Sequence, residues 1–156
     1  MMKKLIACTA GLLLVGAAGL VAAEVSPEQQ IEFRKAGYSF MAWNMGKIKA
    51  QAVEGSVPYD QKQVAGAANV IAAIANSGMG ALYGPGTEKS VGHEKTRVKP
   101  ELFQQKEEVG KLAVAFNQAA NNLAKVAAEG DKAKVAEAFG EVGKACKACH
   151  QKFRMD

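Results

Sequence analysis

The sequence predicts an all-α protein, an antiparallel four-helix bundle, and three observations support this prediction. Four segments carry apolar residues at alternating spacings of three and four, which is the period of an amphipathic helix. No segment shows the strict alternation of apolar and polar residues that is typical of a half-buried strand. Two short links and one long link join the four segments, and four amphipathic helices bury their apolar stripes most simply against one another.

The first 23 residues are predicted to be a signal peptide that is cleaved, which leaves residues 24–156 as a single domain. Two lysines precede an apolar, uncharged run at residues 5–21, and small residues at positions 21–23 offer a cleavage point. A membrane anchor is one alternative, but the run is short and rich in glycine and alanine. A lipidated Cys8 is another, but almost no apolar stretch precedes it.

The charge balance argues against a nucleic-acid partner. The formal net charge is +5, and loss of the two lysines of the signal peptide reduces it to +3. An excess this small and dispersed does not form the basic patch of a nucleic-acid-binding protein. The chain also shows no nucleophile paired with a base, no phosphate-binding loop and no second metal site, so we do not expect an enzyme or, after cleavage, a membrane protein.

The first predicted helix has two apolar stripes. Ser26 is its expected N-cap, with Pro27 in the first helical position and Gln29 completing a capping box, and residues 55–58 (Gly-Ser-Val-Pro) end it. The inner stripe contains Ile31, Arg34, Tyr38, Met41, Met45, Ile48 and Ala52. The second stripe contains Phe33, Ala36, Phe40 and Trp43. One helix cannot easily bury both stripes in a small bundle, so the second predicts a homodimer through this helix, the alternative being a wide internal contact.

The other three helices are predicted from their capping residues and from one apolar stripe each. Asp60 and Gln63 form a cap and capping-box pair for the second helix, Pro100 opens the third, Gly130 ends it, and Asp131 caps the fourth. The inner face of the second helix contains Val64, Ala67, Ala68, Ile71, Ile74 and Ala75. That of the third contains Leu102, Val109, Ala113, Phe116, Ala120, Leu123 and Ala127. That of the fourth contains Val135, Phe139, Val142, Cys146, Cys149 and Phe153.

A short motif near the end of the fourth helix predicts a covalently bound haem c. Cys146 and Cys149 lie three residues apart, and His150 follows at once, which is the arrangement that attaches haem through two thiols and binds its iron through an imidazole. A thioredoxin-like redox pair is an alternative, but it needs a strand before the motif and a helix after it. A structural zinc site is another, but it needs about four ligands.

The second axial position of the iron decides the function, and the residues leave it open. Tyr38, Met41 and Met45 are candidates because they lie on the inner stripe of the first helix. A methionine ligand would give a low-spin, six-coordinate electron carrier, whereas a non-ligating residue would leave a five-coordinate iron open to small gases. His93, in the long link at residues 76–99, is either an exposed loop residue or a second axial ligand.

Four groups of residues together resemble a known family, cytochrome c′, the class II c-type cytochromes. Arg34 is followed four residues later by Tyr38, and residues 41–47 read Met-Ala-Trp-Asn-Met-Gly-Lys. Residues 83–88 read Tyr-Gly-Pro-Gly-Thr-Glu, and the Cys-Lys-Ala-Cys-His motif is followed by Phe153-Arg154. The resemblance covers the whole of residues 24–156 and is strongest to the forms found in purple sulfur bacteria.

The resemblance implies a periplasmic homodimer whose haem iron is high-spin and five-coordinate. Such a protein binds the diatomic gases NO and CO, exchanges single electrons, or does both, and it could also meet a redox protein partner. The alternative remains a low-spin electron-transfer cytochrome with Met41 or Met45 as the sixth ligand.

The resemblance also implies roles for residues outside the motif. Tyr38, with Met41 nearby, would guard the distal side, and Arg34 would lie near a haem propionate. Lys35 occupies a place where many members carry Gln. The remaining implied site residues are Thr87 and Glu88, in the loop that closes over the haem edge, and Arg154, beside the proximal ligand His150.

Overall fold

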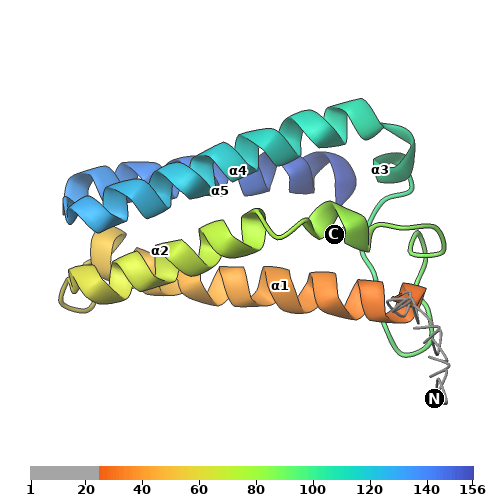
Figure 1. Cartoon of the computed structure of the whole chain (residues 1–156), viewed down its shortest axis with the longest axis horizontal. Helices are drawn as coiled ribbons and strands as arrows, with labels where there is room; N and C mark the ends of the chain where they lie inside the picture. Colours follow the sequence, from red (N-terminus) through yellow and green to blue (C-terminus); the bar gives the residue numbers. More distant parts are fainter. Residues whose placement is uncertain (1–24) are drawn as a thin grey trace, which may run out of the picture.

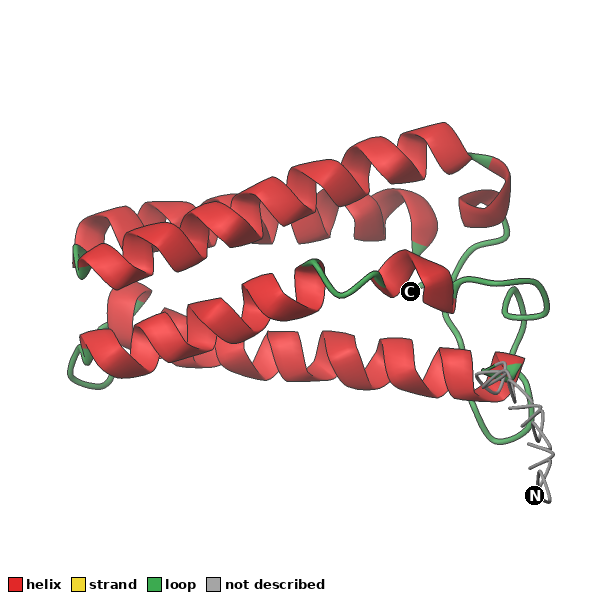
Figure 2. Cartoon of the chain, viewed as in Figure 1, coloured by secondary structure: helices red, strands yellow, loops and turns green. Residues whose placement is uncertain are grey.

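The computed structural model describes residues 25–156, which form an antiparallel four-helix bundle (Figures 1 and 2). The long helices are α1 (Pro27–Ile48), α2 (Gln61–Ala75), α4 (Lys106–Glu129) and α5 (Lys132–Phe153). Their chain direction alternates along the bundle (Figure 1). The predicted fold class is confirmed, whereas the predicted signal peptide lies outside the described residues. Among the described helices, none combines the length and the apolar character needed to cross a membrane.

The predicted start of α1 is confirmed in full. The Gln29 amide donates to the Ser26 hydroxyl (3.3 Å), and the Ser26 amide donates to the Gln29 side-chain oxygen (3.0 Å). These two bonds satisfy backbone donors that no helical carbonyl can reach, and Pro27 lacks an amide hydrogen at the next position. The direction in which the chain enters α1 is therefore set by local sequence.

The cap of α2 is confirmed, but its predicted capping box is wrong. The Asp60 carboxylate accepts from the Gln63 amide (3.0 Å), as expected. The Asp60 amide, however, donates to the side chain of Gln51 (2.8 Å), and the Gln63 side chain donates to the Asp60 carboxylate instead. Gln51 reaches this position because residues Lys49–Val53 form a π-helix, labelled η1, after α1, and its side chain is 5% exposed.

The prediction of one continuous third helix from Pro100 is also wrong. A single turn, α3 (Glu101–Gln104), precedes α4, and the backbone at Gln105 (φ −99°, ψ 52°) leaves the helical region. The segment just before α3 is held by the C-terminus, because the Lys99 amide donates to the Phe153 carbonyl (2.9 Å) and the Met155 amide to the Arg97 carbonyl (2.7 Å). These long-range bonds fix α3 independently of α4.

The apolar core fills one half of the bundle. It contains the buried residues Met41, Ile48, Ala52, Val64, Ala67, Ala68, Ile71, Ala75, Ala120, Leu123, Ala127, Val135, Ala138 and Val142. Ile31, Leu102 and Phe153 are also buried but stand outside this cluster, toward the long link. The Cys-Lys-Ala-Cys-His motif therefore lies at the edge of the core, with Cys146 packed against it.

The turn between α4 and α5 supplies a test of the fold. Gly130 has φ +82°, a left-handed conformation that costs a residue with a side chain about 1–2 kcal/mol. We expect Gly130→Ala to lower the free energy of unfolding by at least about that amount, measured by urea denaturation of the ferric holoprotein, because the added Cβ would also displace the end of the Gln61 side chain. Gly110→Ala is the matched control, because Gly110 is helical and its added Cβ would meet no atom within 4 Å. Equal effects of the two variants would contradict the role of the left-handed turn.

Candidate haem site

The two predicted attachment thiols lie on the last turns of α5. Cys146 and Cys149 are half-buried and form no disulfide within the described residues. Burial raises the pKa of both thiols, and the neighbouring Cys149 adds to the effect on Cys146. Redox-active CxxC pairs have the opposite property, a lowered thiol pKa, so the site does not resemble a thioredoxin-like pair.

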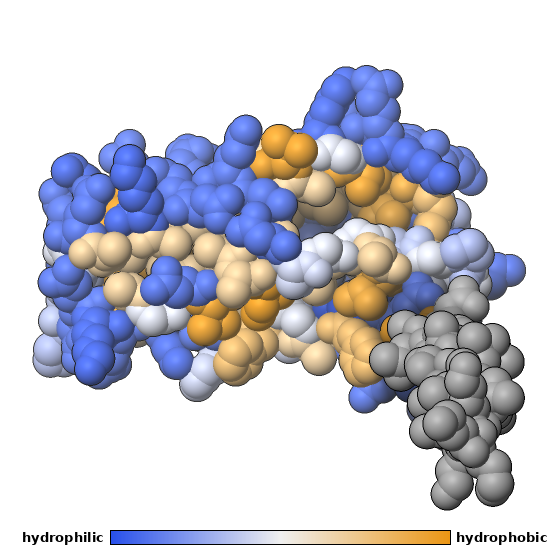
Figure 3. All heavy atoms as spheres, viewed as in Figure 1, coloured by the Kyte–Doolittle hydropathy of each residue, from blue (hydrophilic) through white to orange (hydrophobic). Residues whose placement is uncertain are grey.

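The helix that carries the thiols packs mainly on elements other than α1. α5 packs closely on residues Lys49–Val53, just after α1, but contacts α1 itself at few points. Figure 3 shows hydrophobic side chains gathered toward the half of this face nearer the long link, while the opposite end is largely hydrophilic. A flat apolar group attached to α5 would thus find an apolar end of the bundle beyond the core.

His150 lies next to Arg154 at the end of α5. The Arg154 Nη1 is 3.4 Å from the His150 Nδ1, and the backbone at Arg154 pairs with Val98 in an isolated β-bridge. Burial lowers the pKa of His150, and the charges of Arg154 and Arg97 lower it further. The neutral imidazole that a metal requires is therefore favoured.

Two tyrosines, Tyr38 and Tyr83, meet through their hydroxyl groups. The Tyr83 hydroxyl donates to the Tyr38 hydroxyl at 3.2 Å. Tyr38, on α1, is 42% exposed, whereas Tyr83 follows a short 3₁₀ helix (η2, Met79–Leu82) and is only partly exposed. Burial raises the pKa of each phenol, and negative charge on Cys149 would raise both further, which places the two rings close to the haem motif.

Arg34 is buried (2% exposed) and ties α1 to the long link. Its two terminal nitrogens donate four hydrogen bonds of 2.8–3.0 Å to Leu82, Thr87 and Thr96. Burial lowers the pKa of Arg34, but an arginine stays protonated at physiological pH. The contact between Arg34 and Thr87 was not predicted from the sequence, and both terminal nitrogens of Arg34 donate to neutral protein acceptors. The propionate contact stays a prediction.

Of the other three predicted site residues near the loop, Thr87 and Glu88 lie near Arg34, whereas the Lys35 side chain pairs with Glu94. Thr87 is fully buried, and its hydroxyl donates to the Gly84 carbonyl (2.8 Å) in the turn at residues 83–88. Glu88 lies near enough to Arg34 to oppose the lowering of its pKa. Lys35 instead forms an ion pair with Glu94 (2.6 Å), so its ammonium is directed to the loop. Thr87 and Arg34 therefore form one buried unit, and Lys35 lies outside it.

The methionine candidates are part of the core. Met41 is 6% exposed and belongs to the core cluster, and Met45 packs against the same cluster. His93 is exposed, and its backbone amide donates to the Glu28 carboxylate (2.9 Å), which agrees with an exposed loop histidine. Tyr38 is the one of the three first-helix candidates that is exposed and lies outside the core cluster.

Comparison with known proteins decides the family. The family model described as Cytochrome C' matches residues 29–154. The chain belongs to the cytochrome c′ family. It is 63% identical to the cytochrome c′ of Allochromatium vinosum over 155 residues, which cover 98% of this chain and 99% of that protein.

Two sets of solved structures share this cytochrome c′ fold. One is a cytochrome c′ described as having an unusual ligand-controlled dimer dissociation, with 63% identity, a TM-score of 0.83 and coverage of 86% of this chain and all of that one. The other is the cytochrome c′ of Alcaligenes xylosoxidans, with a TM-score of 0.74, 30% identity and coverage of 84% and 98%. Variants of the Alcaligenes protein are described in complex with carbon monoxide and with nitric oxide.

As a member of this family, the chain carries haem c, bound covalently through Cys146 and Cys149. The residues present fit the group: two half-buried thiols, an imidazole whose neutral form is favoured, and a pair of tyrosines within reach of the thiols' charge. The described residues contain no cluster of three or more His, Cys, Asp or Glu that could hold a metal ion, so the zinc alternative lacks ligands there.

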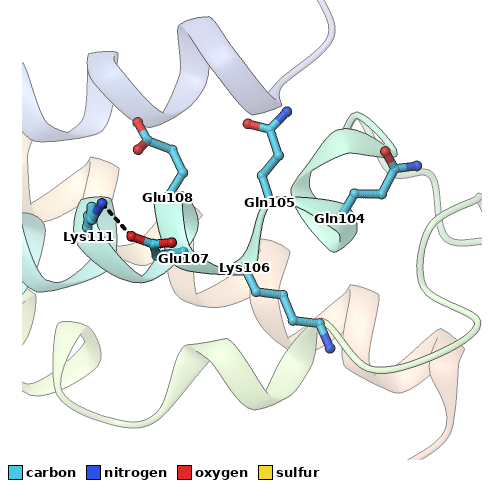
Figure 4. A pocket seen from close by; sticks show the side chains of 6 residues that line it. All are labelled: Gln104, Gln105, Lys106, Glu107, Glu108 and Lys111. Carbon is cyan, nitrogen blue, oxygen red and sulfur yellow. Dashed lines mark ion pairs between the residues drawn. The ribbon is translucent and has the colours of Figure 1, made fainter.

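One surface hollow lies away from the thiols and the two tyrosines. It lies at the junction of α3 and α4, as Figure 4 shows, and its six side chains are polar. Glu107 and Lys111 form an ion pair at 2.7 Å across one part of it. A hollow of this kind has neither the apolar lining nor the convergent groups of a ligand site.

The sequence predictions did not assign a role to Tyr83 or Thr96. Tyr83 was present in the turn that carried the resemblance, but no spacing connects it with Tyr38, which lies 45 residues earlier. Thr96 accepts a hydrogen bond from Arg34 over a separation of 62 residues. Such contacts leave no periodic signal in a sequence.

Proposed function

We propose that this member of the cytochrome c′ family is a periplasmic haem protein with a five-coordinate, high-spin iron, which binds NO and CO and also exchanges single electrons. When bound, the haem supplies an iron whose open face accepts a diatomic gas. The observation that carries the proposal is that Tyr38 lies close enough to Cys149 and Cys146 for their charges to affect its pKa, while Met41 belongs to the core cluster and Met45 packs against it. The gas complexes described for the Alcaligenes variants support the same class of ligand.

Each residue of the site has a proposed task. His150 binds the iron as the proximal ligand, and Arg154 lies against its Nδ1. A carboxylate next to Nδ1 would accept a hydrogen bond and make the imidazole more electron-rich. Arginine only donates hydrogen bonds, so Arg154 does not have this effect on His150. Tyr38 is the proposed distal gate, defined as the side chain that a gas must displace before it bonds. Arg34 and Thr87 hold the loop over the haem edge.

The visible spectrum of the dithionite-reduced protein, before and after carbon monoxide is added, tests this function. We expect a broad high-spin spectrum that sharpens when the gas binds. A sharp low-spin spectrum that the gas does not change would contradict the proposal, and it would support Met41 or Met45 as a sixth ligand and a role in electron transfer alone.

Export to the periplasm is part of the same proposal. The expected signal peptide at residues 1–23 predicts that the protein purified from the periplasmic fraction begins at Glu24. Covalent attachment would leave the haem on the chain in a denaturing gel. A chain that keeps its first residues in the membrane fraction would contradict this part of the proposal.

The exposed face of α1 supports a homodimer. Phe33, Phe40 and Trp43 are 47%, 49% and 56% exposed, the last two rings stack at 5.4 Å between centroids, and the Lys47 ammonium lies 3.3 Å from the centre of the Trp43 ring. Exposed aromatic side chains gathered on one helix are typical of an interface. The dimer named for a cytochrome c′ of 63% identity makes a second copy of this chain the proposed partner.

A charge on this face should separate the subunits. We expect Trp43→Glu to weaken the dimer by at least about 30-fold, because large aromatic side chains are typical hot spots of interfaces. Sedimentation equilibrium measures the effect. Val114→Glu is the matched control, since Val114 is equally exposed (56%) but lies on α4. If both variants dimerise like the unmodified protein, the interface is not on this face of α1.

A further inference from the structure

We propose that Tyr83 is a second determinant of gas affinity, because its hydroxyl holds the distal gate Tyr38 closed. The two hydroxyls are 3.2 Å apart and are supplied by α1 and the start of the long link. We call this pair the tyrosine latch. The inference rests on the proposed gas-binding function and adds to it a residue that never needs to touch the gas.

Tyr83 is the fixed member of the latch. One face of its ring lies 4.5 Å from the Arg34 guanidinium carbon, and its ring centre lies 6.4 Å from that of Phe103 at an angle of 55°. Arg34 is itself held by four hydrogen bonds and is almost fully buried. A ring supported by a fixed cation and a second aromatic ring loses its freedom to turn.

Tyr38 is the movable member. Its side chain is 42% exposed, and the Tyr83 hydroxyl is the hydrogen-bond partner that the structure gives it. A tyrosine side chain turns about two bonds only, so one hydrogen bond at the tip restrains much of its motion. An exposed ring held at its tip can swing aside once that bond breaks.

The latch adds a cost to gas binding that the bulk of Tyr38 alone does not explain. If the gate must swing aside before a gas bonds to the iron, the hydrogen bond to Tyr83 must break, unless the displaced ring finds an equal partner. A net hydrogen bond between neutral groups corresponds to about a two- to tenfold change in an equilibrium constant. The same factor should appear in the association rate, because the bond breaks before the gas arrives at the iron.

The first experiment is a carbon monoxide titration of the dithionite-reduced holoprotein with single and double variants. Tyr83→Phe should raise the affinity by about two- to tenfold, and Tyr38→Phe should do the same, since each removes the hydroxyl pair and keeps the ring. The double variant should show no further gain, because there is only one bond to lose. Tyr59→Phe is the control, because the Tyr59 hydroxyl is buried and makes no hydrogen bond in the described part of the chain.

The second experiment reads the latch without any gas. The tyrosine bands in the ultraviolet resonance Raman spectrum report the hydrogen bonding of the phenols, and they should differ between the reduced holoprotein and its Tyr83→Phe variant by more than the loss of one tyrosine. Difference spectra against Tyr59→Phe, which also lacks one tyrosine, isolate that excess. If the Tyr83→Phe variant shows no spectral change beyond the loss of one tyrosine, the latch is overturned.

The outcomes separate the latch from the function on which it rests. If Tyr38→Ala raises the affinity but Tyr83→Phe leaves it within the error of the unmodified protein, the gate stands and the latch is overturned. Independent gains that multiply in the double variant would also overturn the latch, since they exclude a shared bond. If the unmodified reduced protein does not respond to carbon monoxide at all, the proposed function itself fails, and the latch fails with it.

Discussion

Replacement of Tyr38 by alanine is expected to raise the affinity of the reduced protein for carbon monoxide by about 10- to 100-fold. Two contributions add up in this estimate. The first is the hydrogen bond to Tyr83 (3.2 Å), and the second is the strain of moving a bulky side chain out of the proposed path of the gas. Alanine removes both, because it has neither the ring nor the hydroxyl.

The measurement is a titration followed in the visible spectrum, with two comparisons. Tyr38→Phe keeps the ring, so the difference between the phenylalanine and alanine variants gives the steric part alone. Tyr59→Ala is the control for loss of a tyrosine near the opposite end of the core, where burial raises the pKa of the phenol and the charge of Asp131 raises it further. An affinity of Tyr38→Ala equal to that of the unmodified protein would remove Tyr38 from the distal side.

Replacement of Arg34 by methionine should lower the free energy of unfolding by about 3–5 kcal/mol. The variant keeps the length and apolar stem of the side chain but removes the donor of four hydrogen bonds. Two backbone carbonyls and two hydroxyl oxygens in and beside the loop then lose their partner, and each unsatisfied buried acceptor costs about 1–3 kcal/mol before the site relaxes.

The next residue provides a matched control for this variant. Lys35 is also a cation on α1 that contacts the loop, but its ion pair with Glu94 is exposed (50% and 24%). Lys35→Met should therefore change the stability by about 1 kcal/mol or less. Urea denaturation of the ferric holoprotein measures both, and limited proteolysis should cut Arg34→Met first in residues 84–96. Similar losses in the two variants would show that burial of Arg34 is not what holds the loop.

Helix positions and the haem motif could be predicted because they depend on neighbours in the sequence. Ser26 caps α1 through an amide three residues away, and Asp131 caps α5 through amides two and three residues away. Burial of Ile31, Ile48 and Val142 follows from spacings of three and four, which place residues on one face of a helix. The thiol spacing of the motif is likewise a local property.

The failed predictions concern places where a distant residue replaces a local partner. The capping box at Asp60 does not form because the Asp60 amide donates to the Gln51 side chain and not to that of Gln63. The expected continuous third helix is interrupted at Gln105, where neither glycine nor proline marks the break, because the preceding segment is bonded to the C-terminus. Hydrogen bonds between segments far apart in the chain leave no pattern in the sequence beforehand.

The sequence by itself therefore determined the four amphipathic helices, the two attachment cysteines and the family, because each depends on short spacings along the chain. Only the tertiary structure decided that Gln51 takes the Asp60 amide, that Arg34 binds Thr87 and Thr96, and that Tyr38 meets Tyr83. The physical reason is the range of the interactions. Caps and helical stripes act over three or four residues, whereas the contacts of Arg34 and the tyrosine latch join residues separated by 45 to 62 positions.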